Sequence, residues 1–400
     1  MKFEVSINKF FSKITLIFIL FSNAYADTRV TSKEALAQVY YNNAEVAYNV
    51  KNYKTAVKSY KSAIDNGHVG AQAGLGICYM TGNGIDKDEK KAVALFRSAA
   101  DKGLDTAQYY LGECYRLGAG VNKNQKMATH WYMKSAKQGC ADAQLEIGRS
   151  LESGNGIAQN KANAAQWYKK AAEQECANAQ HEYGRVCFNG IGVKKNLILG
   201  ISWWRKAAEQ NVGLSQQSLA TCYEMGWGVK KDLKQAASWY QKSSKQGLAP
   251  SQYKLGKFHL EGLVLPKNLD ISFRLFKAAA HQHYALAQQE LGACYENGSG
   301  TKKSLAQALH WYNRAAEQGA SYSQYKIGFI YATRKEFKSA FKWYQKAAKN
   351  NSVDAQFRLA VCYGAGRGVA KNSDKAVFWC RKAANNGHRD ANKLLKQLNK

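Results

Sequence analysis

Two Ser-x-x-Lys tetrapeptides are the residues of this chain whose types and spacing come closest to those of an enzyme. Ser251-Gln-Tyr-Lys254 and Ser323-Gln-Tyr-Lys326 match the motif in which penicillin-recognising enzymes place a serine nucleophile near a lysine. Neither is accompanied by Lys-Thr-Gly or Ser-Asp-Asn, and the sequence shows no set of nucleophile, base and orienting group. The chain is therefore predicted not to be an enzyme, with a cell-wall or antibiotic-related hydrolase as a remote alternative.

A glycine-rich turn and a histidine pair could each hold a ligand. Gly-x-Gly recurs seven times, but no Gly-Lys-Ser/Thr is present and the turns follow predicted helices, whereas a dinucleotide site needs a preceding strand. His281 and His283 have no cysteine or carboxylate at metal-ligand spacing around them. Neither a metal nor a cofactor is predicted.

The nine cysteines mostly occupy repeated positions, which bears on disulfide formation. Equivalent positions in stacked helical repeats should lie roughly 8–10 Å apart, beyond the ~7 Å that a disulfide tolerates between Cα atoms. Few disulfides are expected, and Cys362 with Cys380 is the one pair worth testing. Five cysteines share one helical position, where a small buried apolar residue fits: Cys78, Cys114, Cys222, Cys294 and Cys362.

These residues recur because the chain is a tandem repeat. An Ala-Gln pair or a close equivalent returns every 36 residues with one interval of 32, and a Trp-Tyr ladder follows the same period. Each unit is predicted to be two helices: helix A, which ends in the Gly-x-Gly turn, and helix B, which opens on a capping residue such as Asn124 and ends at a glycine such as Gly139. Two prolines in 400 residues agree with this, since proline costs about 3 kcal/mol inside a helix.

About ten repeats are predicted over residues 39–386, followed by a capping helix at 388–400. The first repeat, about 39–70, and the ninth, 323–354, are 32 residues long and lack the Gly-x-Gly turn. In the seventh, Val264 replaces the second glycine, Pro266 follows and His283 replaces the glycine after helix B. Altered curvature or twist is expected around residues 250–350.

The pattern A-x-x-x-L-G-x-x-Y-x-x-G-x-G-V, followed by K-A-x-x-W-Y-x-K-A-A-x-x-G, resembles the Sel-one-like repeat, a relative of the tetratricopeptide repeat. The resemblance implies an all-α fold, a right-handed α/α superhelical solenoid whose helices A line the concave face. It also implies an adaptor that assembles protein complexes. Secreted bacterial members of the family are linked to envelope functions and host-cell interaction.

The first 26 residues have the pattern of a secretory signal peptide. Three lysines accompany an apolar run at 14–21, and Ala24 and Ala26 provide a small-x-small cleavage site. Cleavage is predicted after Ala26, leaving 27–400 as a single solenoid in the periplasm or outside the cell. The apolar run is too short to span a bilayer as a helix, and an uncleaved membrane anchor is the alternative.

Helix A supplies the ligand-facing residues in tetratricopeptide-like units, so its equivalent positions predict a groove. That groove is nearly neutral, with scattered aromatic and arginine side chains of the kind that anchor protein partners. Packing of these aromatics between repeats is the alternative interpretation. The predicted partner-binding residues are Tyr109, Arg116, Arg149, His181, Arg185, Phe188, Tyr253, Lys257 and Tyr325.

The formal net charge of +29 lies mainly outside this groove. One ladder of cations near the end of helix B also complements the helix dipole. It forms either a solvated outer face or a surface for membrane lipid, envelope polysaccharide or an acidic protein. Nucleic acid is disfavoured by the secretion signal and by the absence of a nucleic-acid-binding module. The predicted basic face comprises Lys134, Lys170, Lys206, Lys242, Arg314, Lys346 and Lys382.

Overall fold

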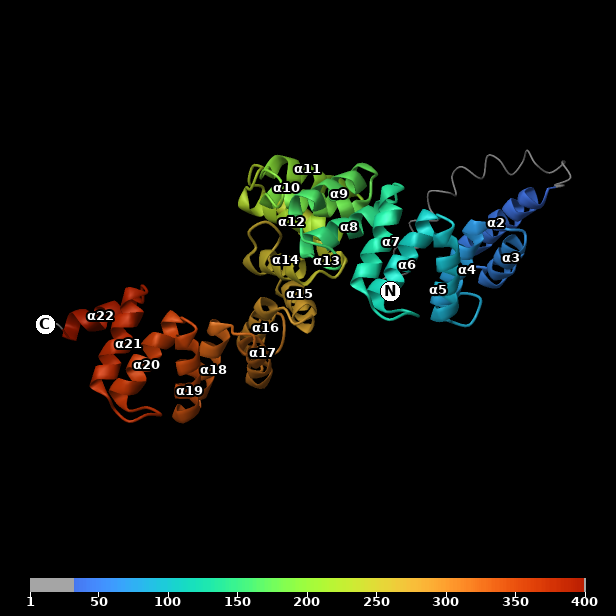
Figure 1. Ribbon diagram of the computed structural model, residues 1–400. Coiled ribbons are helices and arrows are strands. Elements are labelled where there is room, and N and C mark those ends of the chain that lie inside the picture. Colours follow the sequence, from blue (N-terminus) through green and yellow to red (C-terminus); the bar gives the residue numbers. More distant parts are fainter. Residues whose placement is uncertain (1–31, 399–400) are drawn as a thin grey trace. The chain divides into compact units, whose positions relative to one another are not determined.

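The computed structural model describes residues 32–398 of the chain, and within that range every regular element is an α-helix (Figure 1). The chain divides into two compact units, the first ending at Lys206 and the second beginning at Ala207. The predicted signal peptide, residues 1–26, lies outside the described residues. None of the helices in the described range combines the length and apolar character that a bilayer crossing requires.

The first unit alternates helices A and B, and each helix between residues 33 and 189 packs against the next one. Its last helix, α11, contains the boundary between the units. The helices A are α2 (Lys33–Asn49), α4 (Val69–Thr81), α6 (Asp105–Leu117), α8 (Ala141–Ser153) and α10 (Ala177–Asn189). The helices B are α3 (Tyr53–Asp65), α5 (Glu89–Asp101), α7 (Gln125–Lys137), α9 (Lys161–Glu173) and α11 (Leu197–Glu209).

The second unit continues the same alternation and ends in the single helix α22 (Arg389–Leu398). The all-α solenoid of about ten helix pairs is therefore confirmed. The helices A are α12 (Gly213–Met225), α14 (Ala249–Glu261), α16 (Ala285–Asn297), α18 (Ser321–Thr333) and α20 (Val353–Ala365). The helices B are α13 (Leu233–Lys245), α15 (Leu269–His281), α17 (Leu305–Glu317), α19 (Phe337–Lys349) and α21 (Ser373–Asn385).

The two glycines of the Gly-x-Gly turn have different roles. Gly118 ends α6 in the left-handed conformation, with φ 79°, and its N–H donates to the Cys114 carbonyl. Gly120 is also left-handed, and a Cβ added there would lie 2.3 Å from the carbonyl oxygen of Glu89, the first residue of helix B in the preceding repeat. The first glycine thus ends a helix, whereas the second allows one repeat to pack on the backbone of its neighbour.

The departing repeats keep the helix pair and change only the connection. Residues 50–52 and 334–336 join the helices of the first and ninth repeats, which confirms their shorter turns. In the seventh repeat Asn268 still caps α15, and Val264 packs with Leu265 against the cluster that contains Tyr240. Altered curvature in this region stays a prediction.

The glycine in the middle of helix A faces an aromatic ring. A Cβ added to Gly112 would lie 2.6 Å from the ring of Tyr132, the second residue of the Trp-Tyr pair on α7. The ring makes the closest contact, and the Ala128 carbonyl lies at 3.2 Å. The glycine therefore leaves room for the ring, and Ala44, Ala220 and Ala360 stand at the equivalent position in three other repeats.

The glutamine of the Ala-Gln pair connects the ends of successive helices. In the second unit, Gln288 is fully buried; its Nε2 donates to the Ala280 carbonyl at 3.2 Å, and its Oε1 accepts from Gln318 Nε2 at 2.8 Å. The same side-chain pairing joins glutamines or asparagines in six further repeats. The ladder satisfies the carbonyls at the end of helix B, a role that sequence reasoning missed although it used the pair to find the repeat.

Replacing Gln288 with alanine should lower the local free energy of unfolding by about 2 kcal/mol, because it leaves the Ala280 carbonyl and the Gln318 amide without their buried partner. Hydrogen exchange of the α15, α16 and α17 amides measures the loss. Gln72→Ala is the matched control, since Lys102 stands where Gln318 would be and Gln72 Oε1 has no hydrogen-bond partner among the described residues. Equal losses in the two variants would contradict the role of the ladder.

Candidate partner-binding surface

The helix-A face is the surface that contains the nine predicted partner-binding residues. Its aromatic members pack mainly within the repeats: Tyr109 is 9% exposed, with its ring centroid 5.3 Å from that of Tyr110. Phe188 packs on Trp204 at 4.8 Å, and His181 lies 6.4 Å from the same ring. These contacts account for the aromatic residues as packing groups, the alternative that the sequence left open.

Tyr253 and Tyr325 in the second unit are half-buried. Tyr253 lies between Phe276, at 6.0 Å, and Tyr284, at 5.5 Å. Tyr325 lies 6.1 Å from the Tyr344 ring. Each tyrosine therefore packs against neighbouring rings and keeps part of its side chain exposed on the helix-A face.

The cations of the helix-A face in the first unit are held by carboxylates. Arg116 forms a bidentate pair with Glu113, at 2.8 and 2.6 Å. Arg149 lies 2.6 Å from Glu146 and 3.6 Å from Glu182. The predicted near-neutral groove thus consists of specific ion pairs, and these pairs orient the arginines before any partner arrives.

Arg185 links two repeats. Its guanidinium lies 2.8 Å from Glu182, on its own helix, and 2.5 Å from Glu152 on α8. Burial alone would raise the pKa of Glu152, but hydrogen bonds from Arg185 and Tyr168 lower it, so this carboxylate is ionised at neutral pH. The sequence placed Arg185 on this face without showing which carboxylates it meets.

The second unit repeats the pairing with lysine. Lys257 lies 3.0 Å from Glu261 and 3.7 Å from Glu290. Lys254 lies 2.8 Å from Glu224, whose carboxylate also accepts the Tyr240 hydroxyl at 2.6 Å. A tyrosine-bonded carboxylate joined to a basic side chain is therefore a recurring element of the helix-A face in both units.

The predicted basic face differs in its electrostatics. Six of its lysines lie over the tryptophan one turn earlier, as Lys242 does over Trp239 at 4.1 Å and Lys134 over Trp131 at 4.4 Å. Its seven cations are exposed except for half-buried Lys382, and none forms an ion pair with a described carboxylate. These helix-B cations are therefore not neutralised by carboxylates of the described residues.

The serines and lysines of the two Ser-x-x-Lys motifs have structural roles. Ser251 and Ser323 are fully buried, and the Ser251 hydroxyl bonds to that of Ser243 at 2.8 Å. The lysines of the two motifs pair with carboxylates, Lys254 with Glu224 and Lys326 with Glu296. Because each serine is enclosed and each lysine is paired elsewhere, neither motif presents a nucleophile to a substrate.

Other candidate chemistry has little support in the described part of the chain. No group of three or more His, Cys, Asp or Glu side chains there could hold a metal ion, and no disulfide joins any of the nine cysteines. Of the pair singled out for testing, both cysteines are buried, and the Cys380 thiol donates to the Ala391 carbonyl of α22 at 3.6 Å.

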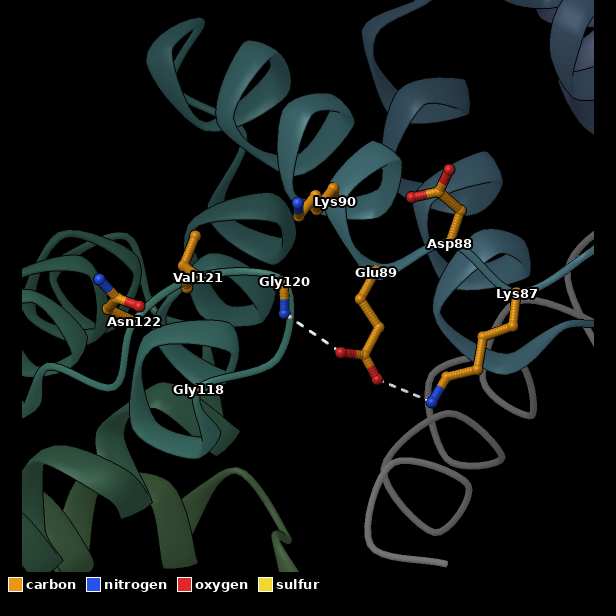
Figure 2. Close-up of a pocket in the computed structure, with 8 residues that line it drawn as sticks. All are labelled: Lys87, Asp88, Glu89, Lys90, Gly118, Gly120, Val121 and Asn122. Carbon is orange, nitrogen blue, oxygen red and sulfur yellow. Dashed lines mark hydrogen bonds and ion pairs between the residues drawn. The ribbon is translucent and has the colours of Figure 1, made fainter.

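Figure 2 shows a surface hollow of about 560 Å³ where the turn 118–122 packs on the start of α5. The Glu89 carboxylate accepts the Gly120 N–H at 3.2 Å and lies 2.7 Å from Lys87 (Figure 2). One carboxylate oxygen therefore bonds across to the next repeat, and the other pairs with a lysine of its own repeat. The hollow is thus a by-product of repeat stacking.

The comparisons with known proteins agree with this architecture. One structure is a protective antigen present in uropathogenic Escherichia coli strains and described as displaying an SLR fold. It is 32% identical with a TM-score of 0.78, over 89% of this chain and 78% of that one. A Sel1 repeat protein from Oxalobacter formigenes is 31% identical with a TM-score of 0.55, over 61% of this chain and 96% of that one. No curated protein matches the chain.

A family model described as the Sel1 repeat matches nine consecutive segments. The first helix pair, α2 and α3, precedes these segments, although it has the same fold as the pairs that follow. The matched segments are residues 69–104, 105–140, 141–176, 177–212, 214–248, 249–284, 285–319, 321–352 and 353–388. With most of its length matched and its helices paired as described above, the chain belongs to the Sel1 repeat family.

Proposed function

We propose that this protein is a non-enzymatic scaffold, exported to the bacterial envelope or secreted, that binds a protein or peptide partner on its helix-A face. Sel1-repeat proteins are generally protein-interaction scaffolds. The single observation that supports the face is the set of ion pairs that fixes Arg116, Arg149 and Arg185 in position on the helices A of the first unit. A surface ordered in advance loses less conformational entropy when a partner binds.

Export and a host-facing role are further parts of this proposal. The apolar run and the small residues at 24 and 26 support cleavage by a signal peptidase. The structural relative from uropathogenic Escherichia coli is described as a protective antigen, which supports a role in host-cell interaction for this chain as well. Sequencing the N-terminus of the protein recovered from the envelope or the medium tests processing after Ala26.

The basic face supports a second candidate, binding to membrane lipid or envelope polysaccharide. The observation in its favour is the row of exposed lysines that lack a carboxylate partner in the described residues, whereas the cations of the helix-A face are neutralised. Unpaired charges on one face attract polyanions over a distance, and salt screens that attraction.

One capture experiment separates the two candidates. The triple variant Arg149→Ala/Arg185→Ala/Tyr253→Ala should capture about tenfold less of the partner that is crosslinked in the native envelope. The reason is that an interface depends on a few anchor residues worth over 1 kcal/mol each. The matched variant Lys134→Ala/Lys170→Ala/Lys242→Ala should capture the partner normally. Loss only in the lysine variant, together with capture abolished by salt, would contradict the helix-A proposal and favour the polyanion candidate.

A further inference from the structure

Glu45 on α2 is a buried carboxylate without a cation. It is 6% exposed, its Oε1 accepts the Tyr60 hydroxyl at 2.7 Å, and its Oε2 has no hydrogen-bond partner among the described residues. The hydroxyl of Tyr41 interacts more weakly with the same carboxyl. Burial raises the pKa of Glu45, and the two tyrosines only partly offset that effect, so the ionised carboxylate is under-stabilised.

In other repeats, the carboxylate that accepts a tyrosine hydroxyl also pairs with an arginine or a lysine. The Tyr132 hydroxyl donates to Glu113, which corresponds to Glu45 once the shorter first turn is allowed for, and Arg116 follows Glu113 by three residues. At the corresponding place after Glu45 stands Tyr48, which carries no charge. The tyrosine-bonded Glu152, Glu224 and Glu296 stand at the helix-A position of Arg116 and Tyr48, three residues after that of Glu113 and Glu45, and they pair with Arg185, Lys254 and Lys326.

A glycine stands on α4 at the position where two later repeats have a lysine that pairs with such a carboxylate. Lys254 and Lys326 each reach back from one helix A to a carboxylate on the preceding helix A. Gly74 on α4 is the equivalent position in an earlier repeat, because it lies five periods of 36 residues before Lys254 and seven before Lys326. A Cβ at Gly74 would lie 2.4 Å from the Tyr60 ring, so the ring takes the space of a side chain there, and beside it the structure has a hollow of about 280 Å³ lined by Glu45 and Gly74. The hollow is smaller than the roughly 300–1,000 Å³ of a small-molecule site and suits one side chain.

The lining of this hollow suits an aliphatic stem with a positive end. Ala73, Ile77 and Leu104 are apolar, Tyr41 and Tyr110 add aromatic rings, and Asp105 adds a second carboxylate. Among the described residues, no lysine, arginine or histidine lines it. His68 stacks on Tyr41 at 4.1 Å, but its Nδ1 accepts the Ala71 N–H and burial lowers its pKa, so it is neutral.

We propose that the hollow formed by α2, α4 and the start of α6 binds a lysine side chain of the protein partner, with its ammonium on the Glu45 carboxylate. Its ammonium takes the role that those of Lys254 and Lys326 have beside Glu224 and Glu296. A desolvated ammonium–carboxylate hydrogen bond gives both affinity and selectivity for charge. This inference rests on the proposed function, since it assigns one contact of a partner on the helix-A face.

The test uses the full chain and the acetylated, amidated tripeptide Ala-Lys-Ala, titrated by ligand-observed NMR. Acetylating the lysine side chain should weaken binding at least about tenfold, because it removes the charge. Glu45→Gln should weaken it to the same degree. Ala73→Leu, which fills the hollow and leaves Glu45 in place, should also weaken it. Glu113→Gln is the matched control, since that carboxylate already pairs with Arg116, and should bind the peptide normally.

Equal binding of the acetylated and unacetylated peptides would overturn the inference, as would wild-type affinity in both Glu45→Gln and Ala73→Leu. These results are separable from the scaffold proposal. If the partner is still captured through the helix-A face while the lysine peptide fails to bind, only the lysine site is wrong. If the peptide binds as expected while capture does not depend on the helix-A face, the scaffold assignment alone is wrong.

Discussion

Replacing Gly192 with alanine should lower the local free energy of unfolding by about 3 kcal/mol, the sum of a left-handed backbone and a steric clash. Gly192 has φ +70°, and a Cβ there would lie 2.1 Å from the carbonyl oxygen of Lys161 and 2.3 Å from its carbon. Both are backbone atoms at the start of α9, so no side-chain rotation relieves the clash. Hydrogen exchange of the α9 and α10 amides reports the local loss, because each repeat contacts only its neighbours.

Gly139 provides the matched control. It is also left-handed, with φ +102°, but an added Cβ would meet no atom within 4 Å. Gly139→Ala should therefore cost only about 1 kcal/mol, from the backbone alone. Later repeats already place Glu175 and Asn211 at this position with φ 61° and 64°. If the two alanine variants lost equal stability, the clash with Lys161 would not be what makes Gly192 necessary.

This contrast shows what the sequence could predict about the fold. Periodicity alone predicted the helix pairs and the glycine turns, because the apolar and capping residues that define them are local. It could not separate Gly139 from Gly192, since both are glycines near helix ends. The difference comes from the neighbouring repeat, whose backbone contacts only the second. Val264 shows the same limit, because its packing against the Tyr240 cluster has no signal in its own turn.

The candidate site follows a similar rule. The equivalent positions of helix A predicted that Arg116, Arg149 and Arg185 share a face, but not that Glu146 and Glu182 would hold two of them. Which carboxylate each cation meets depends on side-chain reach across a repeat, which spacing does not specify. Glu45 was missed for a further reason: the first repeat has a shorter turn, so its numbering relative to Tyr60 departs from the period. Comparing the carboxylates that bond to helix B tyrosines could have found it.

Replacing Tyr168 with alanine should cost about 4 kcal/mol, the range found when a buried aromatic ring is deleted from a core. Tyr168 is fully buried, its ring lies against Gly148, and its hydroxyl donates to Glu152 at 2.8 Å. Tyr168→Phe separates the two contributions. It keeps the ring and should cost only about 1 kcal/mol for the lost hydrogen bond. Urea unfolding followed by circular dichroism, with hydrogen exchange of α8 and α9, measures both losses.

The contact between Tyr168 and Gly148 can also be tested by changing the glycine. A Cβ at Gly148 would lie 2.5 Å from the Tyr168 ring, so Gly148→Leu alone should destabilise α8 and α9 by forcing the ring out of its place. In the Tyr168→Ala background the same leucine enters the vacated space and should restore part of the lost stability. Gly148→Leu should therefore destabilise the wild-type protein and stabilise the Tyr168→Ala variant. Two independent sites cannot produce such a reversal. Simple addition of the two losses would mean that the ring and the glycine do not form one packing unit. The explanation for the glycine at the centre of α8 would then fail.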